Sequence, residues 1–322
     1  MVNSKKLEPL ASAVLSPALV CKNGEISIQE VPAPQIGPSD VLIEVQFVGL
    51  CRTDMYAMAG QIPTKADGLI PGHEFSGRAV AVGSEANDHW LGKTVVANPV
   101  FACNDCEVCQ LGKNHLCADV KMMGVEVDGA CRQQIALDLS QVFEVDELDP
   151  KEAVFAEPLA ATLGILNADI DPDQVGLLLG RGRIAELANR LLLAKGFHRI
   201  TVADLEQASQ LPSSKFDFVV ETGVCAETIR QMVRLAKPHG RLVLKSRQHT
   251  PFEITLREIV SRQQTLQLVH YGCFEEAVDL LKTGKVSVDD LVGDTFSFPE
   301  FRDAIAAAQK SESTKILLAN WS

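Results

Sequence analysis

Short apolar strands alternate with helices between residues 158 and 271, and this alternation restricts the fold more than any other feature of the chain. The run 175–179 is short and apolar, as a strand buried on both faces must be. Residues 183–195 then carry apolar side chains at helical spacing and stop at Gly196. Strands joined by helices in this way predict a parallel, doubly wound sheet.

This sheet is expected to be small. Its other strands are predicted at residues 198–203, 216–220, 241–244 and 266–269, with helices at 226–236 and 256–263. Only eleven residues separate Asp204, which ends the second strand, from the strand that begins at Phe216. A complete doubly wound half would place a helix and another strand in that interval. We therefore expect the sheet to be one strand short.

A glycine-rich turn joins the first strand of this region to its helix. It reads Gly180-Arg-Gly182-Arg-Ile-Ala185, which fits the pattern G-x-G-x-x-A. Glycines there allow a pyrophosphate to approach a helix N-terminus, where N–H groups and the helix dipole favour anions. Asp204 follows 22 residues after Gly182, where a carboxylate would bind a ribose hydroxyl and repel a 2′-phosphate. A lone glycine motif is usually an ordinary turn, but the complete order of elements favours dinucleotide binding, with NAD preferred over NADP.

The rest of the chain has a different pattern. Residues 12–150 predict short strands punctuated by glycine and proline. Within residues 40–50, Val41, Ile43, Val45 and Phe47 share one face. Further strands are predicted at 76–83, 93–99 and 315–319, and C-terminal helices at 274–283 and 299–309. A mainly β domain beside the doubly wound domain suits the length of 322 residues.

Composition excludes several classes of protein. A net charge of −12 argues against a nucleic-acid binder, which needs a basic surface. No stretch of about 18 apolar residues is present to span a membrane. The N-terminal residues 1–6 include two lysines, but no apolar segment of a signal peptide follows. We therefore expect a cytoplasmic protein with reduced cysteines.

Four of the nine cysteines lie within fifteen residues, at Cys103, Cys106, Cys109 and Cys117. Their spacing, C-x2-C-x2-C-x7-C, lets four thiolates surround one tetrahedral Zn²⁺ with no open position, which predicts a structural site. Two disulfides would require an oxidising compartment, and unrelated buried thiols would not need regular spacing. An iron–sulfur cluster also uses closely spaced cysteines, so it remains the alternative.

A second group of metal ligands is scattered through the first half of the chain. Cys51 follows the alternating strand, Gly72-His73-Glu74 lies 21 residues further on, and Glu157 lies at the junction of the two patterns. Together they could hold a Zn²⁺ with a replaceable ligand, which polarises an alcohol oxygen. Each residue alone is more often a core thiol or a solvated polar side chain.

In combination, these motifs resemble the zinc-dependent medium-chain dehydrogenases, the superfamily of alcohol, sorbitol and threonine dehydrogenases. The resemblance extends from about residue 12 to the end of the chain. It implies that Cys51, His73 and Glu157 are catalytic zinc ligands, and that Glu74 is a neighbouring carboxylate that ligates directly or exchanges with water. The cysteine run corresponds to the family's structural zinc lobe, so two zinc ions per chain are expected.

The same resemblance suggests roles for the residues beside Cys51. Thr53 would relay the substrate proton, Arg52 would meet the cofactor pyrophosphate, and Asp54 would orient the histidine ligand. Tyr56 stands where the family often has a proton-shuttling histidine, and tyrosine shuttles protons poorly at neutral pH because its ordinary pKa is about 10. The nucleotide-binding region is also shorter than the family layout by about thirty residues.

The resemblance implies a GroES-like catalytic domain, residues 1–158 completed by 271–322, and a shortened Rossmann domain, residues 159–270. The expected activity is zinc- and NAD-dependent interconversion of a secondary alcohol and a ketone. The substrate would be a small molecule: a polyol, an amino alcohol or a biosynthetic hydroxy intermediate, a bulky one included. The alternative is a cofactor-binding protein of the same fold with lost or zinc-independent reductase activity. The family commonly forms homodimers or homotetramers.

Overall fold

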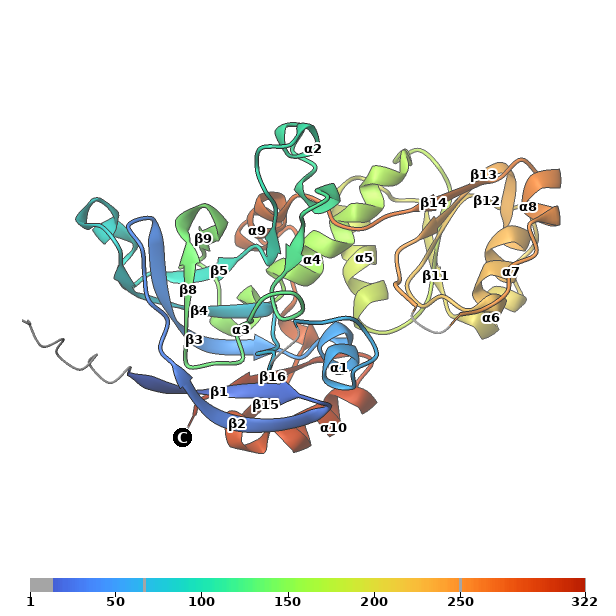
Figure 1. Ribbon diagram of the computed structural model, residues 1–322. Coiled ribbons are helices and arrows are strands. Elements are labelled where there is room, and N and C mark those ends of the chain that lie inside the picture. The colour runs from blue at the N-terminus through green and yellow to red at the C-terminus, as the bar shows by residue number, and fades with distance from the viewer. Residues whose placement is uncertain (1–13, 66–67, 249–250, 322) are drawn as a thin grey trace, which may run out of the picture.

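The computed structural model describes residues 14–65, 68–248 and 251–321. The N-terminal residues for which no signal peptide was predicted lie outside this described part. Figure 1 shows two sheets at opposite ends of the molecule with the helix α4 (Ala156–Leu163) between them. Within the described residues, none of the helices combines the length and apolar character required to cross a membrane.

One sheet has five parallel strands within the described part of the chain, as the alternating pattern predicts. Their order is β11 (Ile200–Ala203), β10 (Gly176–Leu179), β12 (Phe216–Glu221), β13 (Ala236–Leu244) and β14 (Thr265–Leu268). The connecting helices are α5 (Arg183–Ala194), α6 (Leu205–Ser209), α7 (Ala226–Leu235) and α8 (Arg257–Ser261). A complete fold of this type has the order 3-2-1-4-5-6, so the missing strand is the third. Only the short α6 occupies that interval, and β11 becomes an edge strand.

The order of these strands creates a crevice at one edge of the sheet. The chain forms β11 on one side of β10 and then returns to form β12 on the other side. Ligands bind where the strand order reverses, beyond the carboxyl ends of the two diverging strands. Gly180 and Thr222 follow β10 and β12 directly, and both line a pocket of about 1400 Å³.

The second sheet has seven strands among the described residues and combines both ends of the chain. Its main path runs β15 (Val292–Ser297), β16 (Lys315–Ala319), β3 (Asp40–Gly49), β4 (Glu74–Val82), β5 (Thr94–Ala97) and β9 (Val142–Glu144), and β8 (Gln134–Asp138) pairs with β3. Two antiparallel pairs stand apart from it: β1 (Leu15–Lys22) with β2 (Glu25–Pro32), and β6 (Val100–Phe101) with β7 (Lys121–Met122). The C-terminal strand β16 therefore completes a sheet that begins near residue 40.

The predicted core face of β3 changes halfway along the strand. Val41, Ile43 and Val45 are buried as the alternation predicts, but Phe47 is half-buried and Val48 is buried in its place. The register between β3 and β4 shifts between Val45 and Phe47, which marks a β-bulge. An inserted residue reverses the two faces beyond it, so the prediction for Phe47 was wrong.

Helix α4 joins the two halves of the molecule. All of its residues are buried, and its apolar side chains share one core cluster with residues of α5 and of α9 (Phe274–Lys282). The predicted domain boundary after residue 158 falls inside this helix. Outside α4 and the parallel sheet, the described residues also form the helices α1 (Arg52–Met58), α2 (Glu107–Gln110), α3 (Pro150–Ala153) and α10 (Phe301–Lys310). Because helix α4 is buried along its whole length, it is stable only when both halves of the molecule cover it.

Candidate active site

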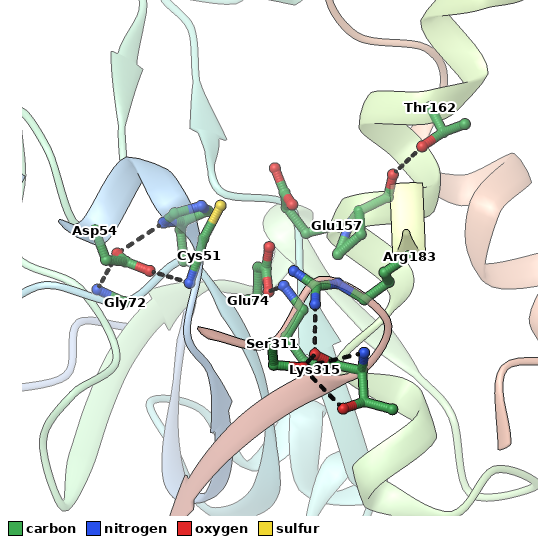
Figure 2. Close-up of polar contacts among 12 residues, drawn as sticks. Cys51, Asp54, Gly72, Glu74, Glu157, Thr162, Arg183, Ser311 and Lys315 are labelled. Atoms are coloured by element: carbon green, nitrogen blue, oxygen red, sulfur yellow. Dashed lines mark hydrogen bonds and ion pairs between the residues drawn. The ribbon is translucent and has the colours of Figure 1, made fainter. Parts of the chain in front are cut away.

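Three of the predicted metal ligands lie together at the base of the large pocket. The ligand atoms of Cys51, His73 and Glu74 all lie within 4.8 Å of one another. Cys51 is the N-cap of α1, and the other two residues come from the first residue of β4 and the residue before it. Figure 2 shows Cys51 and Glu74 beside one another, with Glu157 close by. A thiolate, an imidazole and a carboxylate at this spacing are a suitable donor set for Zn²⁺.

Asp54 holds two of these residues in position. Its fully buried carboxylate accepts hydrogen bonds from the backbone N–H groups of Cys51 and Gly72, each at 3.0 Å, and lies 3.1 Å from Nδ1 of His73 (Figure 2). With Nδ1 donating to Asp54, the lone pair of Nε2 is left for a metal. The arrangement agrees with the orienting role that the resemblance implied for Asp54.

The glycine before His73 is required by the backbone. Gly72 has a φ of +98°, and a Cβ at this position would lie 2.9 Å from Sγ of Cys131. Any other residue would be strained in conformation and would also collide with a buried side chain. Gly72 thus lets the chain turn sharply into β4, which directs His73 toward Cys51.

The electrostatics of the cluster favour a positive charge at His73. Burial alone would lower the pKa of His73, but the charge and hydrogen bond of Asp54, together with Cys51, raise it well above the ordinary value. For Asp54, burial acts in the opposite direction and would raise the pKa. The charge and hydrogen bond of His73, together with the backbone N–H donors, hold the pKa of Asp54 below its usual value. Surroundings that stabilise a proton on this imidazole also stabilise a metal cation bound there.

Glu74 has a second partner that the sequence analysis did not identify. Lys315, the first residue of β16, forms an ion pair with Glu74, and both side chains are almost completely buried (Figure 2). The only signal in the sequence was a lysine at the start of an apolar C-terminal strand. The pair links the cluster of Cys51, His73 and Glu74 to the C-terminal strand across 241 residues of sequence.

Replacing Lys315 by methionine is expected to lower the free energy of unfolding by about 3–5 kcal/mol, because the carboxylate of Glu74 would stay buried without its partner. Urea-induced unfolding of the zinc-free protein measures this loss, because a bound zinc ion would itself compensate the charge of Glu74. The double variant Lys315→Met/Glu74→Gln, which removes both charges, should regain most of it. If the double variant is as unstable as Lys315→Met, the loss comes from packing and not from an uncompensated charge.

Glu157 lies at the pocket wall, outside the compact trio. It is in the first turn of α4, is 5% exposed, and accepts a hydrogen bond from the hydroxyl of Tyr271. Burial is the largest cause that raises the pKa of Glu157, while the charge of His73 opposes this and Glu74 adds to it. Two buried carboxylates therefore lie near His73, of which Glu74 is already paired with Lys315. The contact with Tyr271 could not be predicted from the sequence.

The other residues predicted beside Cys51 also face this pocket. Arg52, Thr53 and Tyr56, all on α1, line it together with Cys51 and Glu157. Arg52 is exposed, whereas Thr53 and Tyr56 are half-buried. An exposed guanidinium and a half-buried hydroxyl on the pocket lining suit the predicted contacts to a phosphate and to a substrate proton.

The glycine-rich turn has an unexpected neighbour. Gly182 has a φ of +81°, and a Cβ there would lie 2.6 Å from the carbonyl oxygen of Glu312. The backbone N–H of Arg183 donates to this same oxygen at 2.7 Å, and its guanidinium donates to the carbonyl of Thr314 at 2.6 Å. The segment before β16 thus packs directly on the N-terminus of α5. The packing of Glu312 therefore requires Gly182, in addition to the tight turn and the approach of a pyrophosphate that the sequence predicted.

The N-terminus of α5 still offers donors to an anion. No acceptor among the described residues pairs with the backbone N–H groups of Ile184 and Ala185. Unpaired N–H groups at a helix start, together with the helix dipole, form an anion site. The turn therefore fits a phosphate group of a dinucleotide.

Asp204 lies across from this turn, at the end of β11. Its carboxylate accepts a hydrogen bond from the N–H of Gln207 at 2.9 Å and so caps α6. Asp204 also lines a second pocket of about 520 Å³, which Gly180, Gly182 and Ala185 share. The residue therefore has a structural role besides the predicted contact with a ribose.

The four clustered cysteines form a separate centre. The distances between Sγ atoms are 3.5 Å for Cys106–Cys109 and Cys103–Cys117, 3.9 Å for Cys103–Cys109 and 4.0 Å for Cys106–Cys117. A tetrahedron with Zn–S bonds of about 2.3 Å has edges of about 3.8 Å. A disulfide would need about 2.05 Å between the sulfurs. The spacing fits one closed metal site.

Comparisons with known proteins agree with this arrangement. The Alcohol dehydrogenase GroES-like domain matches residues 37–147. The chain is 26% identical to L-threonine 3-dehydrogenase of Cutibacterium acnes, over 92% of this chain and 95% of that protein. It is 26% identical to sorbitol dehydrogenase of Bacillus subtilis, over 94% of this chain and 96% of that protein.

A solved structure is also similar over nearly its whole length. A protein of Sinorhizobium meliloti described as a zinc-binding dehydrogenase, bound to NADP, superposes with a TM-score of 0.85 at 27% identity, covering 95% of this chain and 99% of that one. Its likeness extends through both sheets. The resemblance predicted from the motifs is confirmed: the chain belongs to the zinc-type medium-chain dehydrogenase superfamily, with GroES-like and Rossmann folds, and is a nicotinamide-dependent oxidoreductase of the alcohol dehydrogenase type.

Proposed function

We propose that this enzyme uses a catalytic zinc ion and NAD to interconvert a secondary alcohol and a ketone. The observation that carries the proposal is a shared pocket. The metal cluster of Cys51, His73 and Glu74 and the glycine-rich turn at Gly180 line the same cavity of about 1400 Å³. The names of two relatives support the substrate class, since carbon 3 of threonine and the inner carbons of sorbitol are secondary alcohols.

The residues that would hold the zinc are Cys51, His73 and the carboxylates of Glu74 and Glu157. The dinucleotide would contact Arg52, the N-terminus of α5 and Asp204. When bound, zinc supplies a Lewis acid for the alcohol oxygen and the nicotinamide supplies the hydride acceptor. Asp54 keeps His73 oriented. The Thr53 hydroxyl would accept the proton of the alcohol and pass it to water.

We infer that one domain binds the dinucleotide and that the other holds the metal centres. Residues 159–270 contain the five-stranded sheet and would bind the dinucleotide, and residues 1–158 with 271–322 contain both metal centres. The buried helix α4 crosses the first boundary, and β16 returns the chain to the catalytic half. Gly180 and Cys51 come from different sheets, so the cleft between them would exclude water from the hydride path.

The test combines metal analysis with activity. Protein purified without chelators should contain about two zinc ions per chain and should form NADH from secondary alcohols such as threonine or sorbitol. Removal of the catalytic zinc should abolish NADH formation, and added Zn²⁺ should restore it. One zinc per chain, with no NADH formed from any of a broad panel of secondary alcohols, would contradict the proposal.

The choice of NAD rests on Asp204. A carboxylate there repels the 2′-phosphate of NADP, so the ratio of kcat/KM for NAD to that for NADP is expected to be about tenfold or more. Replacing Asp204 by serine should lower this ratio about tenfold. Serine also caps helices well, so α6 should keep its start. The proposal fails if the unchanged enzyme prefers NADP, which is the cofactor bound to the Sinorhizobium meliloti relative.

A further inference from the structure

Two cations on the wall of the large pocket form no ion pair with a carboxylate among the described residues. Lys245 and Arg247 follow directly after β13, at the carboxyl edge of the parallel sheet, and line the same cavity as Cys51 and Glu157. In the part of the chain that the structure describes, neither side chain forms an ion pair. Two such cations on one pocket wall, Lys245 half-buried and Arg247 exposed, stand out in a chain whose net charge is −12.

A buried carboxylate fixes the backbone that carries Lys245. Glu221, at the end of β12, is completely buried and accepts hydrogen bonds from the N–H groups of Lys245 at 2.7 Å and Ser246 at 2.8 Å. Its other oxygen accepts a hydrogen bond from the hydroxyl of Ser246. That hydroxyl also accepts a hydrogen bond from the N–H of Val224 at 3.0 Å. Both oxygens of Glu221 are thus engaged by this segment, and Lys245 is held at the pocket wall.

Arg247 is held on the same wall by aromatic side chains. Its guanidinium donates to Nε2 of His270 at 3.0 Å and lies 5.7 Å from the ring centroid of Tyr271. Tyr271 in turn donates to Glu157. Burial, followed by the charges of Arg247, His115 and Lys245, lowers the pKa of His270 to about 4, so this imidazole is neutral at pH 7. His270 therefore accepts the hydrogen bond of Arg247 without adding a charge to this wall.

The positive charges of Lys245 and Arg247 repel each other. Burial is the main cause that lowers the pKa of Lys245 to about 8, and the charge of Arg247 lowers it further, against the opposing effects of Glu157, Glu221 and Cys51. The ammonium is still protonated at pH 7. An anion placed between Lys245 and Arg247 would replace the lost solvation and relieve the repulsion.

We propose that Lys245 and Arg247 form an anion-binding subsite, and that the secondary alcohol oxidised by this enzyme carries a carboxylate or a phosphate close to its carbinol carbon. The inference rests on the proposed function, because it places the anion next to the alcohol-oxidising centre. A lysine supplies a compact charge and an arginine a planar pair of donors, and both bind carboxylates and phosphates. An anionic substrate also offsets the positive charge of an oxidised nicotinamide in the same cleft.

Matched pairs of probes test the subsite. The carboxylate pair is 3-hydroxybutyrate and its neutral isostere 3-hydroxybutyramide, and the phosphate pair is glycerol 3-phosphate and glycerol. Their affinities for the complex of the zinc-loaded enzyme with NADH are measured by isothermal titration calorimetry, which does not require turnover. In at least one pair, the anion should bind about tenfold or more tightly than its neutral partner. The pair that shows this preference identifies the anion.

Substitutions then assign the preference to the two cations. Lys245→Met should reduce the ratio of anion to neutral affinity to about two or less, Arg247→Leu should lower it as well, and the charge-preserving Lys245→Arg should retain part of it. Lys285→Met, which removes an exposed lysine outside both pockets, serves as the matched control and should leave the ratio unchanged.

Three results would overturn the proposal. The first is a wild-type enzyme that binds neither anion more tightly than its neutral partner. The second is a Lys245→Met variant that weakens both members of a pair equally. The third is a loss of NADH affinity in that variant as large as its loss of anion affinity, which would assign Lys245 to the cofactor. Because calorimetry reports binding alone, failure of hydride transfer would leave an anion preference visible and would count only against the proposed function.

Discussion

Replacing Cys51 by serine is expected to remove one of two zinc ions per chain and to lower kcat/KM for alcohol oxidation about a thousandfold or more. A Lewis acid on the alcohol oxygen contributes several kcal/mol to the transition state, and about 4 kcal/mol corresponds to a thousandfold change in rate. Serine has nearly the size of cysteine but is not a thiolate ligand. Elemental analysis and steady-state kinetics, with the best substrate of the panel, measure the two effects.

The fold should survive this substitution. Cys51 caps α1 through its backbone, whose N–H is bound by Asp54, and serine is a favourable N-cap residue. Cys273→Ser is the matched control, because Cys273 is exposed and also precedes a helix, α9. If Cys51→Ser keeps two zinc ions and an activity within tenfold of the wild type, Cys51 is not a ligand of the catalytic metal.

The second large effect is expected in the lobe of residues 103–117, where Cys117→Ser should remove the other zinc ion and unfold the lobe. This segment has almost no core of its own. Its only buried residues are Cys109 and Cys117, while Leu111 and Leu116 are 67% and 57% exposed. Without metal, little stabilising energy opposes the conformational entropy of the loop. Structural zinc contributes about 10–16 kcal/mol in small zinc-binding domains, which indicates the scale of the loss.

Hydrogen–deuterium exchange detects this unfolding directly. Amides of the lobe should lose protection in Cys117→Ser, while those of the parallel strands β10 and β12 should keep theirs. Activity should fall less than in Cys51→Ser, since none of residues 103–117 lines the large pocket. The lobe approaches the pocket wall where the rings of His115 and His270 lie 6.1 Å apart. A lobe that stays protected after losing its zinc would show that the metal is dispensable for its structure.

Local patterns predicted most of the elements because each one depends on nearby residues. The apolar run at β10, the helical spacing of α5 and the glycines between them identified the parallel sheet, and the short interval after Asp204 correctly indicated a missing strand. The cysteine spacing likewise requires the four thiols to be close, because the loop between them is too short to separate them.

Predictions failed where the cause was distant in sequence. The bulge in β3 arises from its pairing with β4, so the alternation of side chains alone could not reveal that Val48 would replace Phe47 in the core. The buried pairs Glu74–Lys315 and Glu157–Tyr271 join residues 241 and 114 positions apart. No local pattern distinguishes such a lysine or tyrosine from an ordinary one.

The sequence by itself determined the family, the two fold classes and the candidate ligands, because these follow from residue types at short, regular spacings. The tertiary structure decided which of those groups meet. It brought Cys51, His73 and Glu74 together, set Glu157 beside Tyr271 and packed Glu312 against the glycine-rich turn. It also placed Lys245 and Arg247 on the pocket wall with no ion pair among the described residues. The physical reason is that burial, charge compensation and packing depend on residues that only the folded chain makes neighbours.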